Sequence, residues 1–166
     1  LDLLAVAGSL QVDDLVALTA ESTVEQLEAQ QTIRVAAAPT PVAALAHPMY
    51  GEVLRAELGV LEERGLKRDL ADRFEQRRAT APEDLSRLAA WRLDSGGEVE
   101  CAVLLTAGRL SLMGRDSASA VRFAQAAAER GAPHDASRIL VEAALLRSDR
   151  AAAEAAVESV WDDPTL

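Results

Sequence analysis

The chain has 166 residues, of which 49% are hydrophobic, enough material for one core of ordinary size or two small ones. Only 3% are aromatic, so the core must consist mainly of Leu, Val and Ala, and alanine has the highest intrinsic helix propensity. A net charge of −10 opposes binding to nucleic acid, because contacts to phosphates come largely from Lys and Arg. These properties predict a mainly α protein and disfavour a nucleic-acid-binding domain.

The sequence carries no sign of export or membrane insertion. No apolar run approaches the ~18 residues of a membrane-spanning helix, and the first residues lack the basic segment of a secretory signal. Cys101 is the only cysteine, and its apolar neighbours predict a buried, inert thiol, so we expect a cytoplasmic location. The chain begins at Leu1 inside an apolar pattern and without Met. We therefore expect an internal piece of a longer protein.

The first 31 residues predict three short helices. Residues 1–20 contain two of them, separated by Gly8-Ser9. Ser22 and Glu25 have the spacing of a capping box, which would open a third helix that ends near Gln31. Val24 and Leu27 would face inward from this helix.

A β-hairpin is expected next. Ile33, Val35 and Ala37 alternate with their neighbours between Thr32 and Ala38, which is typical of a strand. Pro39-Thr40-Pro41 predicts a turn, and residues 42–46 form a second short apolar run. Three short helices followed by a hairpin is the order of elements in a winged-helix fold.

Two longer helices follow the hairpin. Proline is favoured at the first helical position, so we expect a helix from Pro48 to about Leu58 and, after Gly59, another to about Arg78. The predicted buried face of this second helix carries Leu66, Leu70 and Phe74. The opposite face, which includes Arg73, mixes both charge signs and predicts a solvated surface with i,i+4 ion pairs.

Residues 79–82 are the best candidate for a domain boundary, which gives domains of 1–78 and 79–166. The second domain predicts only helices, at about 83–95, 98–113, 117–130, 135–147 and 150–161. Asp149 follows Asp116 by 33 residues, and similar residues flank both, which indicates helical-hairpin repeats of the tetratricopeptide kind (TPR-like). Ala120, Ala124 and Ala127 would form the small-residue stripe that close helix packing needs.

Motifs for catalysis are missing from the sequence. There is neither a phosphate loop of the Gly-x-x-x-x-Gly-Lys-Ser/Thr type nor a Gly-x-Gly-x-x-Gly motif. One cysteine and two histidines cannot form a zinc site with the usual spacing. We therefore expect no enzymatic activity, no metal and no cofactor in this chain itself.

His47 is the one candidate binding residue. It follows the second predicted strand and precedes a predicted helix, and unpaired N–H groups at a helix N-terminus attract anions. His47 could therefore bind a phosphate there. Alternatively, it only caps the helix and packs against the hairpin.

Two segments resemble a known family. The segment from Val42 to Leu58 reads VAALAHPMYGEVLRAEL and closely resembles the end of the winged-helix domain in large LuxR-type regulators with an ATPase core. The segment from Arg87 to Gly97 reads RLAAWRLDSGG and looks like their first repeat helix. These regulators belong to the STAND class of signal-transduction ATPases.

The resemblance implies an N-terminally truncated winged-helix domain over residues 1–78, followed by an α-α superhelical array of TPR-like repeats. The family's ATPase core would precede Leu1 and its DNA-binding helix-turn-helix would follow Leu166, so ATP or ADP would bind only to the intact protein. In related STAND proteins a histidine matching His47 contacts bound ADP and helps to hold the resting state. Pro48 departs from the acidic residue that many relatives carry there.

The implied function is regulation of transcription: this region relays nucleotide state and senses an inducer or partner through its repeats. Its expected partners are the neighbouring ATPase and DNA-binding domains, together with an inducer or protein on the array. The candidate recognition helix, Thr23 to Gln31, has no Lys or Arg, so we expect no direct contact with DNA. The alternative is a free-standing TPR-like scaffold that binds a protein.

Overall fold

The computed structural model describes residues 1–37 and 39–161, with side chains to residue 158. It divides into two compact units, residues 1–78 and residues 79–166. Ten helices and three short strands lie among the described residues, so the mainly α prediction is confirmed. Each unit has its own core and is described separately below.

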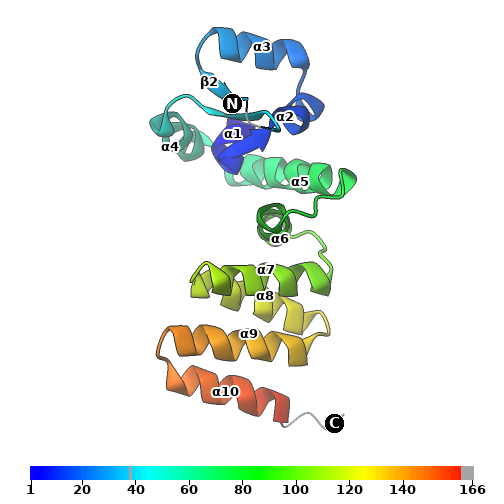
Figure 1. The fold of residues 1–166 in the computed structure, drawn as a ribbon, viewed down its shortest axis with the longest axis vertical. Coiled ribbons are helices and arrows are strands. Elements are labelled where there is room, and N and C mark those ends of the chain that lie inside the picture. The colour runs from blue at the N-terminus through cyan, green and yellow to red at the C-terminus, as the bar shows by residue number, and fades with distance from the viewer. Residues whose placement is uncertain (38, 162–166) are drawn as a thin grey trace. The chain divides into compact units, whose positions relative to one another are not determined.

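The first unit contains five helices around a small sheet. The elements in chain order are α1 (Asp2–Ala7), β1 (Ser9–Gln11), α2 (Val12–Leu18), α3 (Glu21–Ala29), β2 (Ile33–Ala36), β3 (Val42–Leu45), α4 (Pro48–Glu57) and α5 (Val60–Gln76). Helix α1 contacts β3, α4 and α5, while α2 contacts α5 (Figure 1).

The sheet has three antiparallel strands in the order β1-β3-β2, so the expected two-stranded hairpin was incomplete. Gly8, at φ 76°, turns the chain out of α1 and into β1. Leu10 of β1 pairs with Ala43 of β3, and both side chains are buried. The three residues of β1 are too few to show a period-2 pattern, so the sequence predicted only a break between two helices at this point.

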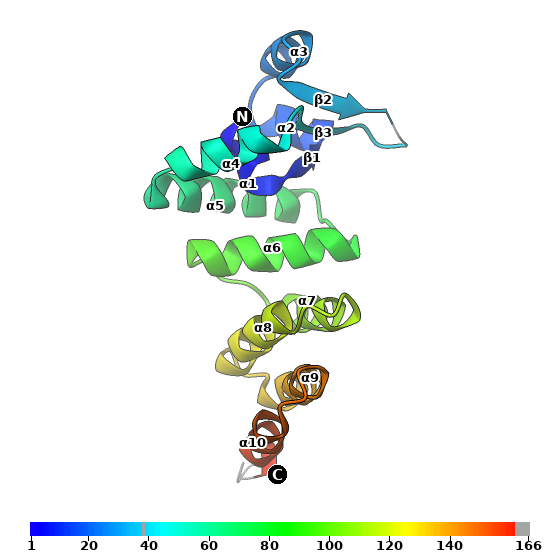
Figure 2. The ribbon, with the colours of Figure 1, turned by 90° about the vertical axis from the view of Figure 1, so that its left-hand side faces the viewer.

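Strands β2 and β3 form the predicted hairpin (Figure 2), with Val35 paired to Ala43. The strand β2 is shorter than the predicted range of 32–38, and Ala38 lies outside the described residues. Beside β2 lies α3, which buries Val24 and half-buries Leu27, as predicted.

The capping box proposed for α3 was wrong. The N-cap is Ala20 instead of Ser22, so the helix begins two residues earlier than predicted, at Glu21, and the methyl group of Ala20 cannot accept a hydrogen bond. Ser22 therefore lies inside the first turn, where its hydroxyl cannot serve as the N-cap.

Helices α4 and α5 begin and end close to the predicted positions, and α5 buries Leu70 and Phe74. Arg73, however, does not lie on a solvated face as expected. Its Nε donates a 2.9 Å hydrogen bond to Oδ1 of Asp14, which is only 1% exposed. The Nε of Arg77 lies 3.0 Å from the other carboxylate oxygen. This buried ion pair ties α2 to α5 across 59 residues of sequence.

The second unit consists of helices that contact each other in chain order (Figure 1). Helix α7 (Cys101–Met113) begins at Cys101 instead of near residue 98, and its N-cap, Glu100, is in extended conformation. The helices are α6 (Pro82–Ser95), α7 (Cys101–Met113), α8 (Ser117–Glu129), α9 (Pro133–Leu146) and α10 (Arg150–Trp161).

Two turns of this unit repeat one another bond by bond. Asp116 accepts a hydrogen bond from the Ser119 amide at 3.0 Å, and Asp149 accepts one from the Ala152 amide at 3.1 Å. The residues before these aspartates, Arg115 and Ser148, have φ of 59° and 57°. The helical hairpins α7–α8 and α9–α10 therefore share one turn geometry at the offset that the sequence indicated.

Small residues allow these helices to approach closely. Ala120, Ala124 and Ala127 of α8 are fully buried, as the predicted stripe required. Gly108 of α7 is also buried, and a Cβ placed there would lie 3.1 Å from Cδ1 of Ile139 in α9. The thiol of Cys101 is only half-buried, in contrast to the prediction, because it sits at the first residue of α7, with its Sγ 3.2 Å from the Arg130 carbonyl oxygen.

Candidate functional site

His47 occupies the junction where the sequence placed it. It is the N-cap of α4, in extended conformation, and Pro48 takes the first helical position. Its Nδ1 accepts a 3.2 Å hydrogen bond from the amide of Met49, so this nitrogen carries no proton in the bond. The imidazole is exposed and its centroid lies 5.9 Å from the ring of Tyr50. The helix cap is therefore confirmed, whereas the expected packing against the hairpin is not shown for this exposed ring, and a contact with nucleotide stays a prediction.

Apolar side chains surround this junction on the exposed face of α4. Met49, Tyr50 and Val53 follow the i, i+1, i+4 spacing of one helix face and are 60%, 48% and 52% exposed. Val60 and Leu61, at the start of α5, are also exposed. Exposed apolar groups of this size mark surfaces that contact other molecules or domains.

The exposed surface of α3 is acidic. Glu21, Glu25 and Glu28 are all exposed, and α3 contains no Lys or Arg. A helix that enters the major groove of DNA needs cations for the phosphates, and carboxylates would be repelled.

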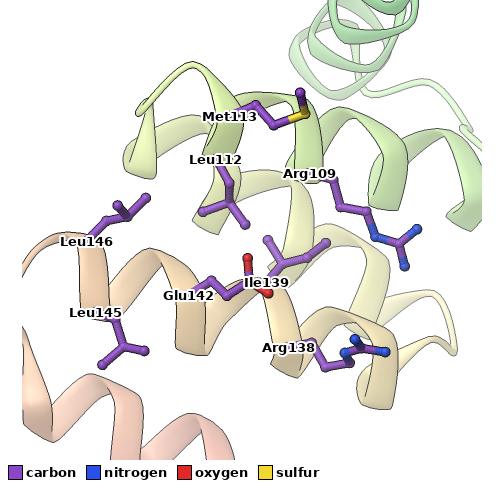
Figure 3. A pocket seen from close by; sticks show the side chains of 8 residues that line it. All are labelled: Arg109, Leu112, Met113, Arg138, Ile139, Glu142, Leu145 and Leu146. Atoms are coloured by element: carbon purple, nitrogen blue, oxygen red, sulfur yellow. The ribbon is translucent and has the colours of Figure 1, made fainter.

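A groove of about 720 Å³ lies between α7 and α9 in the second unit (Figure 3). Helix α7 contributes Arg109, Leu112 and Met113, at the i, i+3, i+4 spacing of one helix face. Helix α9 contributes Arg138, Ile139, Glu142, Leu145 and Leu146, which also share one face.

Charged and apolar groups are separated along this groove. Figure 3 shows Arg109 and Arg138 toward one end and Leu145 and Leu146 toward the other. The guanidinium of Arg109 lies 3.8 Å from the Asp135 carboxylate, and both side chains are more than half exposed. Arg138 makes no ion pair with any residue in the described ranges. The groove thus carries two arginines at one end and a single carboxylate, Glu142, among its lining residues.

The apolar end of the groove is open to solvent. Met113 is 82% exposed, Leu145 is 63% exposed and Leu146 is 46% exposed. Ile139, by contrast, is buried against α7 and forms the floor. Leu112 is half-buried beside it. Side chains of this size, left exposed next to a well-packed floor, are typical of a protein-binding groove.

Sequence reasoning did not find this groove. Arg109 and Arg138 lie 29 positions apart, on helices separated by α8, and only the packing of α9 on α7 brings them to one surface. The repeat pattern was the available signal, because corresponding faces of α7 and α9 must line the same side of a stack of helical hairpins.

Neither a metal site nor a transmembrane helix is found in the described residues. Across residues 1–37 and 39–161, no three His, Cys, Asp or Glu side chains gather closely enough to hold a metal ion. No helix over the same ranges has the length and hydrophobicity needed to cross a bilayer.

Comparison of the chain with protein-family models, with curated proteins and with solved structures found no match. The functional interpretation therefore depends on the residues and their geometry.

Proposed function

We propose that the chain is the regulatory region of a LuxR-type, ATP-dependent transcriptional regulator of the STAND class. In this proposal residues 1–78 form a winged-helix domain that relays nucleotide state. Residues 79–166 form the start of a TPR-like array that senses an inducer or a protein partner. Nucleotide binding and DNA binding belong to other domains of the intact regulator.

The observation that carries the proposal is the strand β1. With it, the first unit has the order α1-β1-α2-α3-β2-β3, and β3 lies between β1 and β2 in the sheet. This order of elements supports the proposed winged-helix domain, because it adds a third strand that the local sequence pattern of residues 1–20 did not predict. The repeated turns at Asp116 and Asp149 support the TPR-like part in the same way.

Several surfaces of the first unit fit a role between domains. The acidic α3 is unsuited to DNA, whereas the apolar face of α4 suits contact with a neighbouring ATPase domain. His47 lies beside that face, with Nε2 of its ring left free of the capping bond. A phosphate of ADP bound at such an interface could accept a hydrogen bond from Nε2 without disturbing the cap.

The test uses the intact regulator and two substitutions that separate capping from sensing. His47→Ala removes both the cap and the imidazole, whereas His47→Asn keeps a good N-cap and removes only the imidazole. We expect both variants to release ADP faster than the wild type and to raise basal transcription. Unchanged ADP retention and unchanged basal output in both variants would refute the sensing role.

The alternative is a free-standing TPR-like scaffold that binds a protein. The groove between α7 and α9 favours it, because all of its lining residues belong to the second unit. A reading frame confined to about residues 1–166 would support the scaffold over the regulator.

A further inference from the structure

The groove between α7 and α9 has the size and the chemistry to select its partner. Its face on α9 runs from Arg138 to Leu146, which at 1.5 Å per residue is about 12 Å of helix. A partner that fits this length is a short peptide segment, about two turns long if helical.

Charge complementarity determines which segment fits. Arg109 and Arg138 place two guanidinium groups at one end of the groove, and the guanidinium of Arg109 lies 3.8 Å from the exposed carboxylate of Asp135. Guanidinium groups bind carboxylates in strong, charge-assisted hydrogen bonds. At the other end, Met113, Leu145 and Leu146 expose apolar surface that a partner's large apolar side chains would cover.

We propose that this groove binds a short amphipathic segment of a protein partner. An acidic side chain of the segment lies between Arg109 and Arg138, and large apolar side chains one or two turns away cover Met113 and Leu145. This inference rests on the proposed function of the second unit as an interaction surface, and it adds the chemistry of the partner.

Other occupants fit less well. A small-molecule ligand needs a pocket that buries most of its surface, whereas Met113 at 82% exposure marks an open groove. Nucleic acid needs more cations than these two arginines, and Glu142 lies in the middle of the same face. A second copy of the chain would bring a further net charge of −10 toward a molecule of the same charge.

The experiment begins with a displayed library of random 12-residue peptides, selected on the full 166-residue chain. The proposal predicts enrichment of sequences that combine Asp or Glu with Leu, Ile, Met or Phe. Failure to enrich any sequence, or enrichment of basic or purely polar sequences, would overturn it.

The most enriched peptide is then synthesised and its Kd measured by fluorescence anisotropy. The double variant Arg109→Glu with Arg138→Glu should weaken binding about tenfold or more, as should Met113→Ser with Leu145→Ser. The matched control, Arg68→Glu with Arg115→Glu, makes the same change in net charge at exposed sites outside the groove and should alter Kd less than about twofold.

The four substituted side chains are all exposed (Arg109, Met113, Arg138 and Leu145). The variants should therefore keep the wild-type melting temperature. Equal weakening by the control and groove variants would overturn the proposal, since it would show non-specific charge attraction. These outcomes are independent of ADP retention by the intact regulator. If the groove does not bind peptides as predicted, the proposed function is not affected. If ADP retention is unchanged, the peptide-binding experiment still tests the groove.

Discussion

The contact between Gly108 and Ile139 decides how closely α9 packs on α7, and it can be tested by substitution. Gly108→Ala should gain up to about 1 kcal/mol, because alanine is the better helix former. The new methyl group would, however, lie 3.1 Å from Cδ1 and 3.4 Å from Cγ2 of Ile139. Overpacking of this kind costs about 1–3 kcal/mol. We therefore expect a net loss of about 0–2 kcal/mol in unfolding free energy.

A double-mutant cycle with Ile139→Val isolates the clash. The single Ile139→Val change removes Cδ1 and should cost about 0.5–1.5 kcal/mol. In the Gly108→Ala background it also removes the closest contact, so the double variant should be more stable than additivity predicts, by about 0.5–1 kcal/mol.

Urea unfolding followed by tryptophan fluorescence measures these free energies, because both tryptophans of the chain, Trp91 and Trp161, belong to the second unit. Gly65→Ala in α5 is the control, because a Cβ there meets no atom within 4 Å, and it should stabilise the chain by a few tenths to about 1 kcal/mol. Its effect belongs to the first unit and is measured by circular dichroism. If Gly108→Ala stabilises as much as Gly65→Ala and the cycle is additive, the close approach of α7 and α9 is refuted.

Three further predictions concern single side chains. Asp14→Asn should destabilise the first unit by about 2–3 kcal/mol. This loss is smaller than for a fully buried pair, because Arg73 and Arg77 are 24% and 19% exposed. Hydrogen exchange of the amides in α2 and α5 measures the loss of stability, and exchange as slow as in the wild type would contradict the prediction. Hydrogen bonds from the side chain and the amide of Ser119 lower the pKa of Asp116 below its ordinary value of 3.8. Because the folded pKa is the lower one, the ionised carboxylate stabilises α8 above that ordinary value and loses this effect as the pH falls through the lowered pKa. The stability difference between wild type and Asp116→Asn should therefore shrink between pH 6 and pH 3 in urea titrations, and a constant difference would contradict the assignment. His47→Ala should lower the unfolding free energy of the isolated chain by about 0.5–1 kcal/mol, whereas His47→Asn should change it very little, because only the alanine removes the N-cap acceptor. Equal losses of stability for the two variants in thermal unfolding would contradict the capping role.

Local patterns predicted the helices well. The buried stripe of Ala120, Ala124 and Ala127 follows from helical periodicity alone, and the start of α4 follows from Pro48. These signals depend on residues close together in sequence. The turns at Asp116 and Asp149 were also visible, because the same residue types recur at a fixed spacing.

Contacts between distant residues escaped sequence reasoning. The ion pair of Asp14 with Arg73 joins two helices 59 residues apart, and one charged residue gives no sign of which partner it will meet. Strand β1 exists because β3 pairs with it, since three residues have no strand preference strong enough to show. The groove likewise depends on how α9 packs against α7, which the repeat pattern suggested without specifying its lining.

The coding sequence on either side of residues 1–166 provides the most direct test of the proposal that this chain joins an ATPase core to the start of a repeat array. We expect a Gly-x-x-x-x-Gly-Lys-Ser/Thr phosphate loop upstream of Leu1 and a helix-turn-helix downstream of Leu166, in one reading frame. A reading frame that begins near Leu1 and stops near Leu166 would contradict it.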